Sequence, residues 1–114
     1  MVKKILVVDD EKDILTTIKN ILEYEGYEVT AEIDSRKAVL LSAKNEYDLI
    51  ILDVLMPFSG EETAKLIRKG VKGNPKIVFC TVVARPDVNM EGINGFIEKP
   101  IDPKRFAAQV KKFV

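Results

Sequence analysis

The stretch ILVVDDE at residues 5–11 decides the fold of this chain. Four apolar residues run without a break and end directly in three acidic residues, Asp9, Asp10 and Glu11. A short, unbroken apolar run bounded by polar residues is typical of a strand that is buried on both faces of a parallel sheet. The acidic residues would then lie at the carboxyl end of that strand, where open parallel sheets bind their ligands.

Three further apolar runs end in the same way. LIIL at residues 49–52 is followed by Asp53, IVFC at 77–80 by Thr81, and GFIE at 95–98 by Lys99. If these strands lie side by side, the carboxylates meet at one edge, where each pair within ~5 Å costs about 3 kcal/mol at an effective dielectric near 20. Such a cluster requires a cation, and oxygen ligands of this kind suit Mg²⁺ or Ca²⁺ rather than zinc.

The segments between the apolar runs predict helices and one edge strand. Apolar residues at helical spacing predict helices over residues 11–25, 35–45 and 61–70, and a last helix that begins near residue 102. Residues 27–31 alternate and predict an edge strand. We expect the following helix signals: Asp10 and Asp102 as caps, Asp34 or Ser35 at the start of the second helix, and Gly26 and Gly70 at helix ends. The expected inward residues are Ala64, Leu66 and Ile67 in the third helix and Phe106, Val110 and Phe113 in the last.

This alternation of strands and helices predicts an α/β domain with a five-stranded parallel sheet and helices on both faces. One connection is short for that pattern. Only residues 82–95 separate Thr81 from Phe96, and they include Pro86, Asn89, Gly92 and Asn94, which disfavour a helix. We therefore expect the helix of this connection to be shortened or absent.

Composition narrows the function classes. The chain has 114 residues, which predicts a single domain, with 18 basic and 18 acidic side chains and no histidine. Zero net charge, no basic stripe and no appended helix-turn-helix argue against nucleic acid as a partner. No stretch is long enough to span a membrane, and the apolar run near the start is too short for a signal peptide. With its single cysteine, Cys80, the protein is expected to be cytoplasmic.

Acid pair, lone aspartate, threonine and lysine, in this order at successive strand ends, resemble the receiver domain of two-component response regulators. The resemblance covers essentially the whole chain. It rests on four motifs, VVDDE at 7–11, LDVLMP at 52–57 with Gly60, Thr81, and EKP at 98–100. It implies a flavodoxin-like, doubly wound fold with strand order 2-1-3-4-5.

The resemblance also implies roles for individual residues. Asp53 would accept a phosphoryl group, and Mg²⁺ would be held by Asp10, Asp53 and the main-chain carbonyl of Leu55, with Asp9 acting mostly through bound water. Lys99 would pair with Asp53 and then with the phosphoryl group, and Thr81 would donate its hydroxyl to a phosphoryl oxygen. Two further implied features are a switching aromatic ring at Phe96 and a cis Lys99–Pro100 bond.

The implied function is that of a stand-alone receiver in a phosphorelay. It would take its phosphoryl group from a sensor histidine kinase or a histidine phosphotransfer protein, and it would signal by a conformational switch to an unknown downstream protein. Such a phosphoacceptor catalyses its own phosphorylation and dephosphorylation without being a conventional enzyme. Val82 follows Thr81 where the family usually has a small residue, so we expect it to narrow access to Asp53.

Three alternatives remain to be compared. A degenerate receiver, used as an interaction module without phosphorylation, is favoured by Val82 and the short connection but opposed by the intact acidic residues, Thr81 and Lys99. A phosphohydrolase of the haloacid dehalogenase type needs an Asp-x-Asp pattern after the first strand, which residues 9–12 do not have. A flavodoxin needs a Ser-, Thr- and Gly-rich phosphate loop there, and none is present.

Overall fold

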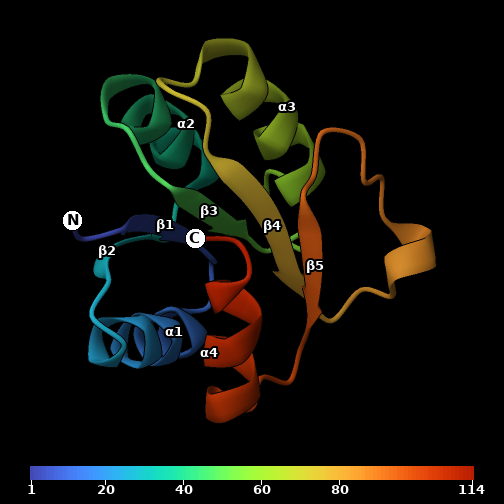
Figure 1. Ribbon diagram of the computed structural model, residues 1–114. Coiled ribbons are helices and arrows are strands. Elements are labelled where there is room, and N and C mark those ends of the chain that lie inside the picture. Colours follow the sequence, from blue (N-terminus) through green and yellow to red (C-terminus); the bar gives the residue numbers. More distant parts are fainter.

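The computed structural model describes residues 1–114 as an α/β fold built on one parallel sheet (Figure 1). The strands are β1 (Lys4–Val8), β2 (Glu28–Glu32), β3 (Leu49–Leu52), β4 (Lys76–Thr81) and β5 (Gly95–Glu98). The helices are α1 (Lys12–Tyr24), α2 (Ser35–Lys44), α3 (Gly60–Gly70) and α4 (Pro103–Lys111), with one 3₁₀ turn, η1, at Arg85–Asp87. The strand order is β2-β1-β3-β4-β5, with every pair parallel, which confirms the predicted fold class.

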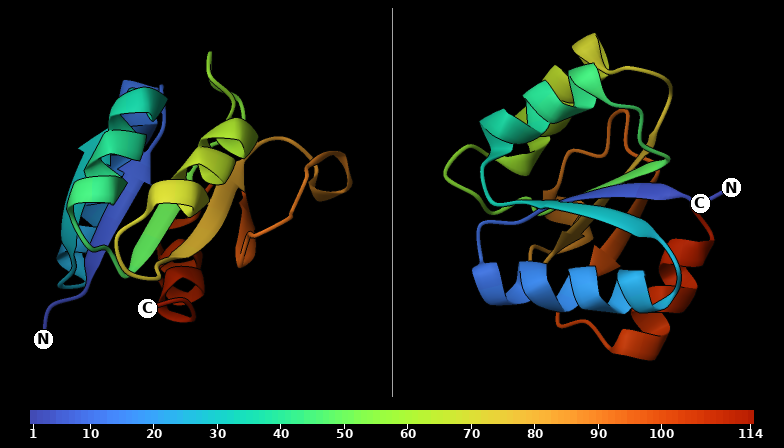
Figure 2. Two further views of the ribbon diagram at one scale, coloured as in Figure 1. Left: turned by 90° about the horizontal axis from the view of Figure 1, so that it is seen from above. Right: turned by 90° about the vertical axis from the view of Figure 1, so that its left-hand side faces the viewer.

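The helices form two layers around the sheet, with α1 and α4 on one face and α2 and α3 on the other (Figures 1 and 2). Successive residues of β1 alternate between the two resulting cores. Ile5 and Val7 pack with α1 and α4, whereas Leu6 and Val8 pack with α2 and α3. This double burial explains why the strand is apolar at every position rather than at every second one.

Two details of the helices differ from the prediction. Asp10 does not cap α1, because the helix begins at Lys12 and the cap position falls on Glu11, which makes no capping bond. The carboxylate of Asp9 instead accepts a hydrogen bond from the Glu11 amide at 2.9 Å. In α3, Leu66 is 40% exposed, since the inward stripe runs through Thr63, Ala64 and Ile67.

The predictions for the other helix ends are confirmed. Gly26 follows α1 with a positive φ of 94°, and Asp34 and Asp102 cap α2 and α4 through hydrogen bonds to the amides of residues 36 and 105. The predicted inward residue Phe113 lies beyond the end of α4 and is partly buried. Its ring packs against Gly95, where a Cβ atom would come within 2.5 Å of it.

The connection between β4 and β5, residues 82–94, contains only the turn η1, which confirms the predicted loss of a helix. We call these residues the β4–β5 segment. Val88 is its one buried side chain. Arg68 of α3 fixes the far end of the segment, donating to the Gly92 carbonyl at 2.9 and 3.0 Å and to Asn94 Oδ1 at 2.8 Å. In the first turn of α3, the carboxylate of Glu61 accepts a hydrogen bond from the Asn89 amide at 2.5 Å.

None of the helices combines the length and the apolar character that crossing a membrane requires. The peptide bond between Lys99 and Pro100 is cis, as the resemblance implied.

Candidate functional site

The carboxyl ends of four strands bring the predicted site residues to one edge of the sheet. Val8 pairs with Leu52 across β1 and β3, so Asp9, Asp10 and Asp53 follow directly beside one another. The Asp53 amide also donates to the Val8 carbonyl at 3.0 Å, which extends the pairing by one residue. Thr81 pairs with Glu98 at the ends of β4 and β5, and the amide of Lys99 donates to the Thr81 carbonyl at 2.9 Å.

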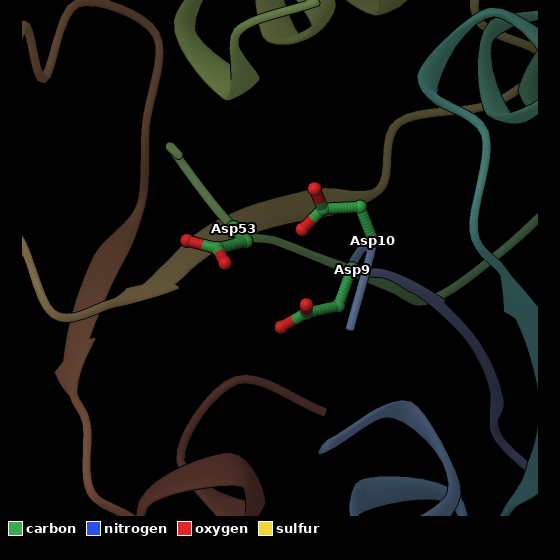
Figure 3. A group of neighbouring side chains, drawn as sticks. All are labelled: Asp9, Asp10 and Asp53. Carbon is green, nitrogen blue, oxygen red and sulfur yellow. The ribbon is translucent and has the colours of Figure 1, made fainter. Parts of the chain in front are cut away.

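The three aspartates form a compact acidic cluster (Figure 3). One carboxylate oxygen from each lies within 4.8 Å of the others. Asp9 and Asp53 are only 2% and 4% exposed, whereas Asp10 is open to solvent. The carboxylates of Asp9 and Asp53 are therefore withdrawn from water, and a buried carboxylate without a partner is costly in free energy.

Lys99 lies against both buried carboxylates. Its Nζ is 2.7 Å from Asp9 Oδ2 and 2.9 Å from Asp53 Oδ2, and its side chain is only 6% exposed. The pairing of Lys99 with Asp53 was predicted, but the shorter bond to Asp9 was not. No local pattern signals this bond, because it joins residues 90 positions apart in the chain.

Burial and pairing compete in setting the charges of this group. Desolvation raises the pKa of Asp9, against the lowering effect of its hydrogen bonds from Lys99 and the Glu11 amide. For Lys99, burial alone would lower the pKa, but the hydrogen bonds to Asp9 and Asp53 outweigh it and the pKa is raised. Lys99 therefore stays protonated at neutral pH.

Thr81 is fully buried at the end of β4, and its hydroxyl oxygen accepts a hydrogen bond from the Val83 amide at 3.3 Å. This bond uses a lone pair and leaves the hydroxyl proton available to another acceptor. Phe96 is partly buried and packs against the core formed with α2 and α3. The side chains of Leu55 and Val82 are 56% and 65% exposed, so both face solvent near the site residues that they adjoin in sequence.

The donor set fits a hard divalent cation. Three carboxylates carry three negative charges, and the Lys99 ammonium compensates for one of them. The remaining charge of two matches a divalent ion, and the available ligand atoms are all oxygens. Mg²⁺ in particular binds through one or a few carboxylates while it keeps several waters, and the exposure of Asp10 leaves one side of the cluster open to water.

Comparison with known proteins gives consistent results. The family model of the response regulator receiver domain matches residues 5–111. Among curated proteins, the alkaline phosphatase synthesis transcriptional regulatory protein PhoP of Bacillus subtilis is 35% identical over 115 residues. The match covers 97% of this chain and 48% of that protein. The chain thus spans about half the length of the curated relatives it matches.

Solved structures agree with the observed fold. The response regulator TrrA of Thermotoga maritima, determined in complex with Mg²⁺ and BeF, has a TM-score of 0.88 and 36% identity, and the match covers 98% of this chain and 99% of that one. A CheY-like receiver domain from Methylobacillus flagellatus shares the fold with a TM-score of 0.89 at 22% identity and full coverage of both chains. The family match over nearly the whole chain, together with the acidic edge of the sheet, shows that this chain belongs to the response regulator receiver domain family.

Proposed function

We propose that Asp53 accepts a phosphoryl group from a phosphohistidine of a partner protein, in a reaction that requires Mg²⁺. Receiver domains interact with sensor histidine kinases, and a kinase or a histidine phosphotransfer protein is the donor we propose here. The single observation that carries the proposal is the position of Asp53. Its buried carboxylate clusters with those of Asp9 and Asp10, and its Oδ2 atom lies 2.9 Å from the Lys99 ammonium.

The transfer step follows from this arrangement. A carboxylate oxygen of Asp53 forms a bond to phosphorus while the bond from phosphorus to the donor imidazole nitrogen breaks, giving an acyl phosphate. The imidazole leaves with the electron pair of that bond and takes up a proton. A bound Mg²⁺ ion would neutralise charge on the transferring phosphoryl group, and Asp10, Asp53 and the Leu55 carbonyl would hold it, with Asp9 acting mostly through water.

Two side chains of the protein would then bind the new phosphoryl group. Lys99 would exchange its contact with the Asp53 carboxylate for one with a phosphoryl oxygen, while Asp9 keeps its own bond to the ammonium. Thr81 would donate its free hydroxyl proton to a second oxygen. Movement of Thr81 toward the phosphoryl group would open space for Phe96, and this change would signal to a downstream protein.

Incubation with acetyl phosphate and Mg²⁺, followed by intact-mass measurement, tests the proposal. The wild type should gain one phosphate, and Asp53→Asn should gain none. Asp87→Asn is the matched control, because Asp87 is an exposed aspartate of η1 at a distance in sequence from every proposed ligand. Phosphate on the Asp53→Asn variant would assign the acceptor role to another residue.

A second candidate is a degenerate receiver that binds its partner without phosphorylation. The β4–β5 segment favours it, because the connection lacks the helix expected for the family and begins with the bulky Val82. A wild-type mass that stays unchanged, while Mg²⁺ still shifts the melting temperature, would support this alternative.

A further inference from the structure

The loop between β3 and α3 carries two of the proposed ligands, Asp53 and Leu55. We call residues 53–60, from the end of β3 through the first residue of α3, the acid loop. Two hydrogen bonds from main-chain amides connect residues within this loop. The Leu55 amide donates to Asp53 Oδ1 at 3.2 Å, and the Gly60 amide donates to the Val54 carbonyl at 3.0 Å. The direction of the Asp53 carboxylate is therefore tied to the path of the loop.

Gly60 has no room for a side chain. A Cβ atom built there would lie 2.8 Å from the carbonyl carbon of Asp53 and 2.9 Å from Cα of Val54, and closer still to the Asp53 carbonyl oxygen. These neighbours are backbone atoms, so they cannot rotate away as the end of a flexible side chain could. The φ angle of Gly60 is not positive, so the requirement at this position is space and not an unusual backbone conformation.

The opposite side of the acid loop is tied to α2. Ser35, the first residue of that helix, is only 4% exposed, and its hydroxyl donates to the Phe58 carbonyl at 3.0 Å. The first turn of α3 is fixed in turn by Thr63, whose hydroxyl donates to the Ser59 carbonyl at 2.8 Å. The loop is thus held between two helix starts, one on each side.

We propose that Gly60 and Ser35 are positioning residues of the phosphoacceptor and metal site. Gly60 lets the first turn of α3 rest directly on the Asp53 peptide, and Ser35 fixes the far side of the loop. Together they set where the Asp53 carboxylate and the Leu55 carbonyl point. This inference rests on the proposed function, since it assigns those two groups as ligands.

The effect of disturbing the loop should appear first in metal affinity. Loss of groups that orient metal ligands typically weakens metal binding 10- to 100-fold. We expect Gly60→Ala to raise the Mg²⁺ dissociation constant at least about tenfold, because the added methyl group must push α3 and the Asp53 peptide apart. Ser35→Ala adds no atom and removes only the contacts of the hydroxyl with the Phe58 carbonyl and the Met56 sulfur, so its effect should have the same direction and be smaller.

The test is a titration of the full chain with Mg²⁺, in which the amide NMR shifts of Asp10 and Leu55 report binding of the ion. Gly70→Ala is the matched control, because Gly70 ends the same helix and a Cβ there meets nothing within 4 Å. We expect Gly70→Ala to bind Mg²⁺ like the wild type. A folded Gly60→Ala variant with wild-type affinity would overturn the inference.

Two further outcomes are decisive. If Gly60→Ala does not fold, Ser35→Ala decides the matter, since an unchanged Mg²⁺ affinity in that variant would overturn the positioning role of the loop contacts. If the wild type itself shows no saturable shift, the metal part of the proposed function fails and the inference fails with it. If the wild type binds Mg²⁺ and both variants bind it equally well, the positioning inference is overturned but the proposed function is not.

Discussion

The segments that follow β3 and β4 begin side by side but differ in how much of each is packed in the core. After β3 the chain forms the acid loop and then α3, which buries four of its residues, Gly60, Thr63, Ala64 and Ile67. After β4 the chain forms the β4–β5 segment, which buries Val88 alone and extends away from the sheet (Figure 1). Asp53 and Leu55, two of the proposed ligands, lie on the segment that leads into a well-packed helix. The β4–β5 segment places only Val88 in the core and is also attached through hydrogen bonds to Arg68 and Glu61 of α3.

Core substitutions should show this difference most strongly. Ile67→Ala removes a fully buried side chain and should lower the free energy of unfolding by about 2–5 kcal/mol. Val88→Ala should cost only about 1–2 kcal/mol, because it removes less apolar volume and the irregular segment can settle into the space. Urea unfolding followed by circular dichroism measures both. Equal costs for the two variants would mean that the β4–β5 segment is packed as firmly as α3.

Metal binding should act on the first segment only. At 100 times its dissociation constant, Mg²⁺ should stabilise the fold by about 2.7 kcal/mol, because it relieves carboxylate repulsion in the native state and barely binds the unfolded chain. The melting temperature should rise with Mg²⁺, and Asp10→Ala should abolish most of the increase. Amide hydrogen exchange should slow within the acid loop and remain unchanged over residues 82–94. An increase of the same size in the Asp10→Ala variant would place the bound ion elsewhere.

Removal of the link between the two segments should have an intermediate effect. Arg68→Ala loses the guanidinium bonds to Gly92 and Asn94, and one to the Pro75 carbonyl at 2.8 Å. Because the Arg68 side chain is partly exposed and water can replace some of its hydrogen bonds, we expect the free energy of unfolding to fall by about 1–2 kcal/mol. Lys69→Ala, at an exposed neighbouring position, is the control and should change stability little. Faster amide exchange should appear in residues 89–94 of the Arg68 variant, and exchange like that of the wild type would show that the bonds are not needed.

The smallest effects are expected at the exposed apolar residues beside the site. Leu55 of the first segment and Val83 of the second are apolar and cannot orient a water molecule for attack on the acyl phosphate, and Val82 crowds the approach to Asp53 further. We therefore expect slow loading by acetyl phosphate and slow decay. Val82→Ala should accelerate both steps by relieving crowding, and intact-mass time courses would follow them. Unchanged loading in this variant would show that Val82 does not restrict access to Asp53.

The structure brings the predicted site residues to one edge of the sheet because each of them stands at the end of an apolar run that forms a strand. Strand ends are visible in sequence, and parallel pairing brings them together without further information. The missing helix was predictable for a similar local reason, since Pro86, Gly92 and Asn94 disfavour a helix over so short a stretch. The strand order came from the family resemblance and not from the pattern of residues.

What the sequence did not predict depends on contacts between distant elements. The bond from Lys99 to Asp9 joins residues 90 positions apart and requires the register of four strands. The close packing of Gly60 on Asp53 depends on the path of a loop that no periodicity describes. The error at Asp10 arose from a helix start displaced by one residue, a shift that sequence patterns do not resolve. The error at Leu66 arose at the edge of a helix face whose other predicted residues, Ala64 and Ile67, are buried.

The bonds of Arg68 have a consequence for how this chain tolerates changes in length. A helix satisfies most of its own carbonyl groups, but in the β4–β5 segment a side chain of another element supplies donors to Gly92 and Asn94. Residues added or removed near η1, before Asn89, would leave those donors in place. A change of one residue between 92 and 94 would move the acceptors out of reach and shift the start of β5. The segment therefore has one end at which length can vary and another at which it cannot.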